Sequence, residues 1–315
     1  MLQIIIFSYN RALQLDTLIT SFIEKWQAPQ YYVDIIYNSS DKDFQKAYDV
    51  LIEKYRNIPN IVFNKEKNVK DKYSVKELLN IRNFIAYIKN KRKFTPKSNF
   101  RSLCIEILKK NKNDFVMFLT DDSMFIENVN IETEIFNWIK EYPNKRQFSL
   151  RMGVGINNKG NNVKEKCKYI FWEFHQNPRN TNWGYPFSVD AHIYHKKPIM
   201  KLFSKYIFCN PNTLEGFINA QVYRKQIFEE GKANIKCSLL SYPINMVQTI
   251  EKNETLGIDC KILNKMFLNG YTMRYPIPDK NDTFQQYPKH LYFKKDDEVK
   301  KVLIQDKLDW IFLNV

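Results

Sequence analysis

Apolar runs and amphipathic segments alternate near the start of the chain, and this alternation limits the possible folds more than any other feature. Residues 2–7 form a short β-branched run that predicts a buried strand, and residues 13–26 carry apolar side chains at helical spacing. The pattern continues with a strand over 32–37, a helix over 44–55 and a strand over 60–63. Strands linked by helices form right-handed crossovers and a parallel sheet, so the sequence predicts an α/β unit.

A fourth strand is predicted over residues 114–119, and the polar residues 120–123 (TDDS) follow it directly. Ligands of open α/β sheets bind at the C-terminal ends of the strands, where the strand order reverses. We therefore expect a crevice at the ends of the strands that finish at Phe7, Tyr37 and Leu119.

The rest of the chain is predicted to contain both helices and strands. Helices are expected over 78–88, 100–110, 198–206, 214–230 and 258–269, strands over 147–151 and 271–275, and a loop and strand over 183–195. With 315 residues, the chain is too long for one ordinary domain and short for two. We expect one large α/β unit with an extension.

The chain is strongly basic, with 49 Lys and Arg against 34 Asp and Glu, a net charge of +15. Such a surplus attracts nucleic acid, anionic lipid or phosphorylated substrates. A codon bias towards Lys, Asn, Ile, Phe and Tyr would raise the charge without any partner, and both explanations stay open. The basic run at 89–93 (KNKRK) is either a solvated helix end or a contact for anionic lipid heads.

Cysteine usage favours a reducing compartment. The five cysteines are scattered, form no C-x-x-C pair and are odd in number, which argues against a disulfide framework and a structural zinc site. The sequence shows neither a signal peptide nor an apolar run near the ~18 residues of a membrane span. We expect a cytoplasmic protein, with peripheral association at the inner face of an anionic membrane as an open alternative.

Asp121 and Asp122 are the first candidates for chemistry. Adjacent carboxylates repel each other unless a cation or hydrogen bonds neutralise them. Hard divalent cations bind oxygen ligands and bridge to substrate phosphates with few protein contacts. The alternative is a solvated turn, and the buried strand before the pair favours a site.

Several segments resemble GT-A glycosyltransferases, most closely the family-2-like bacterial enzymes. Residues 115–123 (FVMFLTDDS) resemble their strand and aspartate motif, and residues 5–11 (IIFSYNR) resemble their first strand and nucleotide-holding loop. Residues 148–153 (FSLRMG), 185–192 (YPFSVDAH) and 210–215 (NPNTLE) resemble later segments in the same order. Each motif is short, so their order over roughly residues 1–220 carries the resemblance.

The resemblance implies a GT-A, Rossmann-like nucleotide-sugar-binding fold with a mostly parallel central sheet and a C-terminal extension. Residues 1–230 would form the catalytic domain, and residues 231–315 would complete the acceptor side. It further implies an inverting transfer from a nucleotide-sugar donor to a hydroxyl of a glycan or lipid-linked acceptor, with Mn²⁺ or Mg²⁺ as the cofactor.

The same resemblance assigns site residues. The donor would be bound by Ser8, Tyr9, Asn10, Arg11, Asn38, Arg101 and Asp121. The metal would be held by Asp122, with His290 as a late ligand; the alternative for His290 is a surface histidine.

Two positions depart from the family pattern. Residues 37–40 read YNSS where the family often has DDGS, so Asn38 would have to bind the base as a neutral amide. Ser123 replaces the usual third acid of the aspartate motif. Either Asp122 alone holds the metal, helped by the diphosphate, or metal dependence is weak.

Glu215 falls where the family carries its catalytic base, and a carboxylate there could remove the acceptor's proton. The alternative is that Glu215 complements the dipole of a helix capped by Asn212 or Thr213. Asp190 is the second catalytic candidate, and it is predicted to share a strand face with His192.

Two other functions remain as alternatives. One is another metal-dependent nucleotide-using enzyme, such as a nucleotidyltransferase, although the sequence has no G-x-x-x-x-G-K phosphate loop. The other is a basic nucleic-acid-binding protein. Nucleic acid is not the expected partner, because the basic residues are spread along the chain and form no recognised module.

Overall fold

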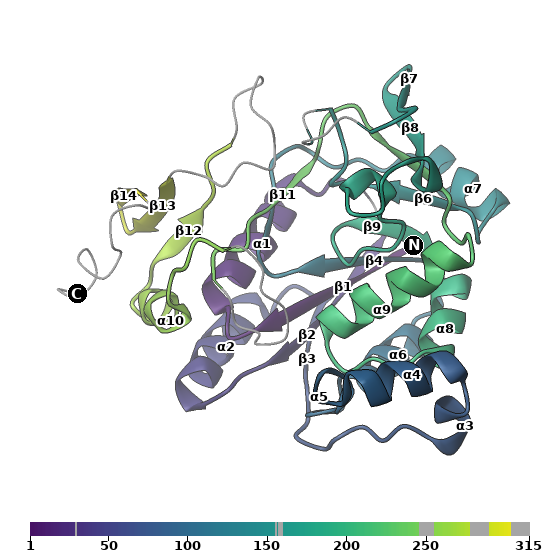
Figure 1. Cartoon of the computed structure of the whole chain (residues 1–315). Helices are drawn as coiled ribbons and strands as arrows, with labels where there is room; N and C mark the ends of the chain where they lie inside the picture. Colours follow the sequence, from purple (N-terminus) through teal and green to yellow (C-terminus); the bar gives the residue numbers. More distant parts are fainter. Residues whose placement is uncertain (29, 155, 157–159, 246–254, 278–289, 304–315) are drawn as a thin grey trace.

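The computed structural model describes residues 1–28, 30–154, 156, 160–245, 255–277 and 290–303. Over these residues a nine-stranded sheet lies between helices, and a two-stranded and a three-stranded sheet accompany it (Figure 1).

The first four main strands form the parallel part of the sheet. Their order is β3-β2-β1-β4, with bounds Leu2–Tyr9 (β1), Tyr31–Asn38 (β2), Ile61–Lys65 (β3) and Phe115–Thr120 (β4). From β1 the chain moves outward to β2 and β3 on one side and later places β4 on the other side. The strand order therefore reverses beside β1, as the predicted crevice requires.

The second half of the sheet has mixed directions. Its order beyond β4 is β9 (His192–His195), β6 (Arg146–Ser149), β10 (Glu230–Asn234), β8 (Tyr169–Glu173) and β7 (Lys164–Lys166). β9 is antiparallel to β4 and β6, and β8 is antiparallel to β10 and β7, whereas β6 and β10 are parallel. Seven of the nine strands thus run in one direction, and the predicted mostly parallel α/β sheet is confirmed.

Both faces of the sheet are buried, and β1 shows why its run over residues 4–7 is continuously apolar. Ile4 and Ile6 belong to one core, while Ile5 and Phe7 belong to the other. Successive side chains of a strand point to opposite faces, so a strand covered on both sides favours apolar residues at consecutive positions. The first core includes side chains from α1 (Ala12–Lys25) and α2 (Lys42–Tyr55). The second includes side chains from α6 (Phe100–Lys110), α8 (Lys196–Lys205) and α9 (Pro211–Arg224).

Shorter elements complete the first part of the chain: α3 (Val75–Leu78), α4 (Ile81–Lys89), α5 (Lys91–Phe94), β5 (Ser123–Phe125), α7 (Thr133–Glu141), η1 (Phe174–Gln176) and η2 (Asn182–Gly184). The helix predicted over 214–230 is too long, because α9 ends at Arg224 and β10 begins at Glu230. The sequence analysis also missed α7 and β8.

The C-terminal part packs against α1. It consists of β11 (Leu239–Ser241), α10 (Cys260–Leu268), β12 (Thr272–Arg274), β13 (His290–Lys295) and β14 (Glu298–Leu303). Thr17 on α1 donates a hydrogen bond of 3.0 Å to the carbonyl of Met273, and Met273 and Phe293 belong to the same core as β1. The division into 1–230 and 231–315 stays a prediction, and its boundary falls within β10 of the central sheet.

Where the structure describes the chain, no helix combines the length and the apolar character that crossing a bilayer requires.

Gly231 on β10 lies directly against the Trp172 ring of β8 in the mixed half of the sheet. It pairs with Trp172 across β10 and β8, and a Cβ atom on Gly231 would lie 2.2 Å from the Trp172 ring. The indole covers the glycine, and Trp172 is itself buried. Gly216 on α9 differs, because a Cβ atom there would meet nothing within 4 Å.

We expect Gly231→Ala to destabilise the fold by about 1–3 kcal/mol, the usual cost of forcing extra volume into a packed core. Gly216→Ala is the matched control. It should stabilise the fold by about 0.5–1 kcal/mol, because alanine loses less conformational entropy in a helix. Urea unfolding of both variants measures this, and equal effects at the two positions would contradict the packing at Gly231.

Candidate functional site

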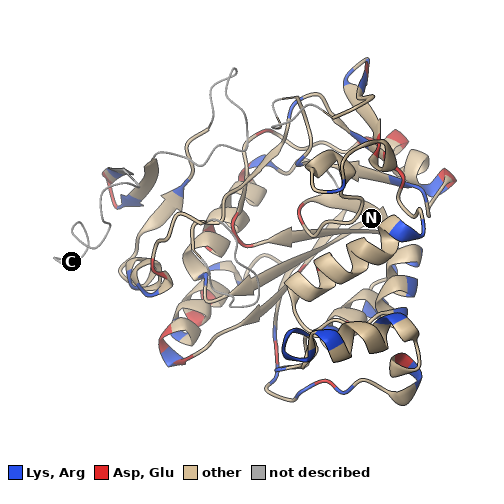
Figure 2. Ribbon diagram, viewed as in Figure 1, with Lys and Arg blue, Asp and Glu red and all other residues tan. Residues whose placement is uncertain are grey.

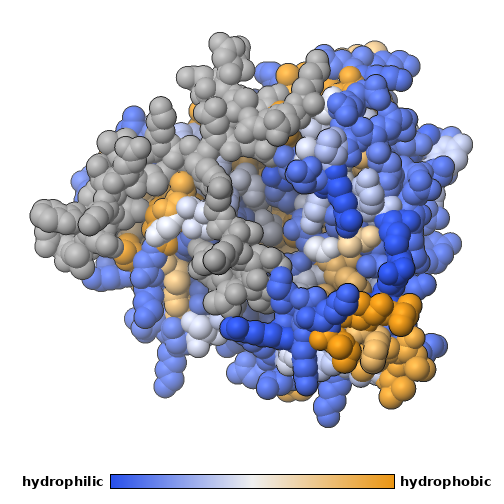
Figure 3. Space-filling model, in the orientation of Figure 1, coloured by the Kyte–Doolittle hydropathy of each residue, from blue (hydrophilic) through white to orange (hydrophobic). Residues whose placement is uncertain are grey.

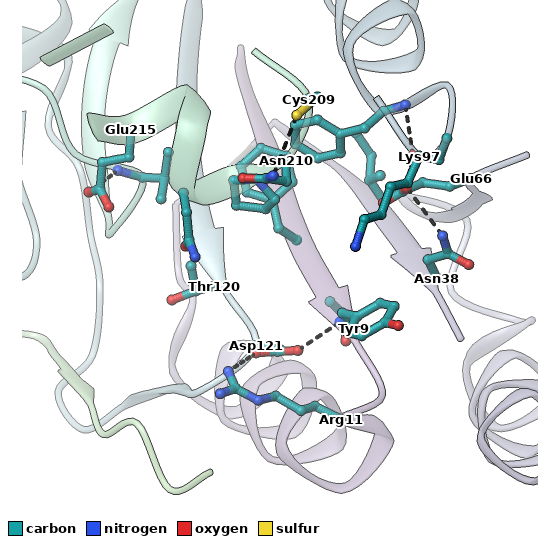
Figure 4. Close-up of a pocket in the computed structure, with 18 of the residues that line it drawn as sticks. Tyr9, Arg11, Asn38, Glu66, Lys97, Thr120, Asp121, Cys209, Asn210 and Glu215 are labelled. Carbon is teal, nitrogen blue, oxygen red and sulfur yellow. Dashed lines mark hydrogen bonds and ion pairs between the residues drawn. The ribbon is translucent and has the colours of Figure 1, made fainter. Parts of the chain in front are cut away.

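A pocket of about 520 Å³ lies at the C-terminal ends of β1, β2 and β4, where the sequence predicted a ligand crevice. Candidates from all three strand ends line it: Ser8, Tyr9, Arg11, Asn38, Asp121 and Asp122. Glu215 lines it from α9, and Figure 4 shows how several of these side chains are arranged.

Arg11 binds the two adjacent aspartates. One of its guanidinium nitrogens, Nη1, lies 2.9 Å from Oδ1 of Asp121 and 3.1 Å from Oδ2 of Asp122. The backbone N–H of Tyr9 donates to the other oxygen of Asp121 at 3.2 Å (Figure 4). These contacts offset the repulsion between the carboxylates. Burial still raises the pKa of Asp121 to about 6, against the opposing effect of Arg11.

Arg11 also connects the site to the C-terminal part of the chain. Its Nε donates to the side-chain oxygen of Asn245 at 2.7 Å, and Nη2 donates to the Asn245 carbonyl. Asn245 lines the pocket as well. The guanidinium predicted to lie near the base is therefore engaged by the aspartates and by Asn245.

Asn10 fastens two loops together instead of lining the pocket. Its backbone φ is +56°, a conformation that asparagine tolerates better than most residues. Its side chain accepts from the Ser40 N–H at 2.9 Å and donates to the Ser40 hydroxyl at 3.0 Å. Asn10 thus holds the loop after β1 against the loop after β2.

Glu66 is a pocket residue that the sequence analysis missed. It follows β3, and its carboxylate accepts hydrogen bonds from Asn38 at 3.3 Å and from the Ser98 hydroxyl (Figure 4). Burial raises its pKa above the ordinary value. The available signal was its place directly after the third parallel strand, at the same edge as the other candidates.

Glu215 is held by the loop that precedes β9. Its Oε1 accepts from the Ser188 hydroxyl at 2.7 Å and from the Val189 N–H at 3.1 Å. Burial raises the pKa of Glu215, although these two hydrogen bonds lower it. The N-cap of α9 is Asn210, not Asn212 or Thr213, and Thr213 completes a reciprocal capping box. Glu215 lies beyond the first turn, so a helix-dipole role fits poorly.

Asp190 does not share a face with His192, contrary to the sequence prediction. Ala191 between them has a φ of +57°, and β9 begins only at His192. This break turns Asp190 towards Arg151, whose Nε lies 2.9 Å from Oδ2 of Asp190. His192 lies in hydrogen-bond contact with Gln147 at 2.8 Å. Asp190 is absent from the described pocket lining.

Two further candidates lie outside the pocket lining. Arg101 on α6 donates to the carbonyl of Phe203 at 2.9 Å and pairs with Glu77, which gives it a structural role. His290 begins β13, and its ring contacts the hydroxyl of Tyr292 at 2.9 Å. Across the described residues, no three His, Cys, Asp or Glu side chains cluster as a metal site.

Comparison with known proteins identifies a glycosyltransferase relative, although no family model matches the chain. The chain is 23% identical over 298 residues to the bifunctional glycosyltransferase pgtA of Dictyostelium discoideum. The match covers 82% of this chain and 34% of the relative, so the chain spans about a third of that protein's length. The resemblance to glycosyltransferases drawn from the motifs is confirmed, while assignment to family 2 stays a prediction.

Solved structures overlap with the chain only partly. TarS of S. aureus aligns with a TM-score of 0.44 and 15% identity, covering 76% of this chain and 36% of TarS. TarS 1–349 in complex with UDP-GlcNAc gives a TM-score of 0.42 and 16% identity, covering 76% and 57%. The mannosyltransferase PcManGT of Pyrobaculum calidifontis, in complex with GDP-Man and Mn²⁺, gives 0.28 and 13%, covering 47% and 34%. The fold is therefore defined by the strand order of this chain.

The environment of Glu215 predicts an effect of Glu215→Gln on stability. The amide oxygen of glutamine can accept both hydrogen bonds, while the buried charge disappears. Because burial raises the folded-state pKa, the stability contributed by Glu215 is full below its ordinary value of 4.5 and is lost as pH rises through the folded value. Glu215→Gln should therefore melt higher than the wild type at pH 7, and this gain should vanish below pH 4.5.

Thermal melts from pH 4 to 8 measure this effect. Glu106→Gln, at an exposed position on α6, is the matched control, and it should melt close to the wild type. A lower melting temperature of Glu215→Gln at pH 7 would mean that the charge of Glu215 stabilises the fold.

Proposed function

We propose that the chain is a glycosyltransferase that moves a sugar from a nucleotide-sugar donor to a hydroxyl of a glycan or lipid-linked acceptor. The transfer is metal-assisted and inverting, and the protein works in the cytoplasm at the inner face of the membrane. One observation carries the proposal: a single pocket at the reversal of strand order holds both the aspartate pair after β4 and the half-buried side chain of Glu215. The similarity to a glycosyltransferase supports it.

The base of the donor would lie beside Asn38 and Glu66. Their side chains hydrogen-bond to each other at the end of β2 and β3, where a heterocycle could exchange donors and acceptors with both. Tyr9 lies at the same end of the pocket and offers a ring for stacking (Figure 4).

The diphosphate would lie between the aspartates and Lys97. Lys97 is exposed, lines the pocket and directs its amine towards Tyr9 (Figure 4). It takes part in none of the ion pairs among the described residues, so its charge remains available for an anion. Arg92 adds a second cation to the same wall. Both would stabilise negative charge on the departing nucleoside diphosphate.

The residues present fit a divalent cation that is shared with the substrate. Asp122 lines the pocket with a side chain that is 12% exposed, and carboxylate oxygen is the ligand that Mn²⁺ and Mg²⁺ prefer. Asp122 would hold the metal together with diphosphate oxygens. When bound, the metal neutralises charge on the leaving group.

Glu215 would act as the general base. The Ser188 hydroxyl and the Val189 N–H fix one carboxylate oxygen, which orients the other for the acceptor's hydroxyl proton. Burial raises the pKa of Glu215, and a carboxylate with a raised pKa is a stronger base in its ionised form. The acceptor oxygen would then attack the anomeric carbon of the donor, as the bond between that carbon and the diphosphate breaks.

Thermal shift with UDP, GDP and CMP, each with and without Mn²⁺, tests the donor site. One nucleotide should raise the melting temperature in a metal-dependent manner. At a hundredfold excess over Kd, binding should add about 2.7 kcal/mol to the free energy of unfolding. Asp122→Ala should fold, lose the metal-dependent part of the shift and lose turnover.

Two outcomes would favour the alternatives. A shift with an oligonucleotide but with no nucleotide would indicate a nucleic-acid-binding protein. Release of pyrophosphate from a nucleoside triphosphate would indicate a nucleotidyltransferase.

We expect Glu215→Gln to lower kcat by about 10²–10⁴-fold, the usual contribution of a positioned base, or about 3–5 kcal/mol. The acidic limb of the kcat/KM profile should disappear with it, because the wild type needs Glu215 ionised. Nucleotide affinity should stay unchanged, since Glu215 faces the acceptor. If affinity falls while kcat holds, Glu215 is a binding residue and Asp190 becomes the next candidate.

A further inference from the structure

Helices α3 and α4 expose a continuous apolar surface. We define the α3–α4 apolar surface by six exposed side chains: Val75, Leu79, Ile81, Phe84, Ile85 and Ile88. Leu79 is 78% exposed and Ile88 is 60% exposed. Figure 3 shows these helices as a gathered hydrophobic area at the lower right of the molecule. Contiguous apolar surface of this kind marks a contact with another molecule or with a membrane.

The orientation of α4 is the reverse of an ordinary surface helix. The one fully buried residue of α4 is polar: Asn83 donates to the carbonyls of Glu77 at 2.8 Å and Lys205 at 2.9 Å. Asn83 also accepts from the Ile207 N–H at 3.3 Å. Surface helices normally turn their apolar face to the core. Here a polar anchor attaches the helix, and the apolar face is left for an external contact.

The apolar surface belongs to a strongly basic segment. Residues 70–93 contain eight Lys and Arg against two acids, a net charge of 8 − 2 = +6. One of the two acids, Glu77, is paired with Arg101. Figure 2 shows the basic residues along α4 and α5. An apolar face bordered by Lys and Arg matches the boundary between anionic headgroups and acyl chains.

A second copy of the chain matches this surface less well. A symmetric dimer would bring the same surface of both copies together and place the two +6 segments against each other. Like charges at an interface oppose association. Anionic lipid supplies the opposite charge and the apolar phase at once.

We propose that the α3–α4 apolar surface docks on an anionic membrane, with the basic residues of 70–91 among the lipid headgroups. Arg92 and Lys93 of α5 line the pocket, so the segment that meets the membrane also forms one wall of the site. Docking therefore brings the pocket to the membrane surface, where a lipid-linked acceptor is presented. The presentation of a lipid-linked acceptor to the pocket rests on the proposed function, whereas the docking on the membrane does not.

Flotation of the full chain with lipid vesicles tests the docking. The protein should float with vesicles of phosphatidylcholine and phosphatidylglycerol, not with phosphatidylcholine alone, and binding should weaken as salt rises. The double variant Leu79→Glu/Ile88→Glu should lose at least tenfold in vesicle partitioning. Both positions are exposed, so its melting temperature should not change.

The matched control is Ile23→Glu/Val50→Glu, which places the same charges at exposed apolar positions of α1 and α2. It should float like the wild type. The proposal is overturned if the wild type does not bind anionic vesicles, or if the two double variants bind equally. It is also overturned if light scattering shows a dimer that Leu79→Glu/Ile88→Glu dissociates while no vesicle binding occurs.

The nucleotide-dependent thermal shift separates this proposal from the proposed function. Leu79→Glu/Ile88→Glu should keep the shift, because neither residue lines the pocket. Vesicle binding without any nucleotide shift would leave the docking standing and contradict the glycosyltransferase.

Discussion

The contact of Arg11 with Asp121 and Asp122 determines the arrangement of the pocket. Two neighbouring carboxylates at the end of a buried strand repel each other and are costly to desolvate. Arg11, from the loop after β1, offsets both effects and also binds Asn245 near the C-terminal part. One guanidinium thus connects the first strand, the fourth strand and a segment more than two hundred residues away. Without it, the acidic floor of the pocket would lack its compensating charge.

This arrangement bears on the missing third acid of the aspartate motif. Ser123 occupies that position, and its hydroxyl donates to Asp190 at 3.3 Å instead of contributing a carboxylate. Any cation at Asp122 would share that carboxylate with Arg11, which already supplies positive charge. The sequence left two alternatives: a metal held by Asp122 with substrate oxygens, or weak metal dependence. Both alternatives stay open, because Arg11 already neutralises part of the charge on Asp122.

Acids that are buried or half-buried line the pocket, and the desolvation of each one costs folding free energy. Burial raises the pKa values of Glu66, Asp121 and Glu215, which means that their charged forms are disfavoured in the fold. Carboxylates with raised pKa values are typical of sites where charge is needed for binding or proton transfer. The exposed apolar face of α4 is a second feature that folding alone does not explain. The segment after α4 connects the two, since its residues Arg92, Lys93, Thr95 and Lys97 line the pocket.

The sequence by itself determined the four parallel strands, the helices between them and the edge of the sheet at which the pocket lies. Periodicity and strand-end polarity are local properties, and a strand buried on both faces is mostly apolar, as over residues 4–7 of β1 and 115–119 of β4. The tertiary structure decided the rest. β10 lies between β6 and β8, although its sequence (EGKAN) is hardly apolar, because Gly231 accepts the Trp172 ring from the neighbouring strand. The turn of Asp190 away from His192 depends on one positive φ at Ala191, which no period reveals. Amphipathic spacing showed that α4 has an apolar face, but whether that face meets the core or the solvent depends on contacts such as those of Asn83, which distant segments provide.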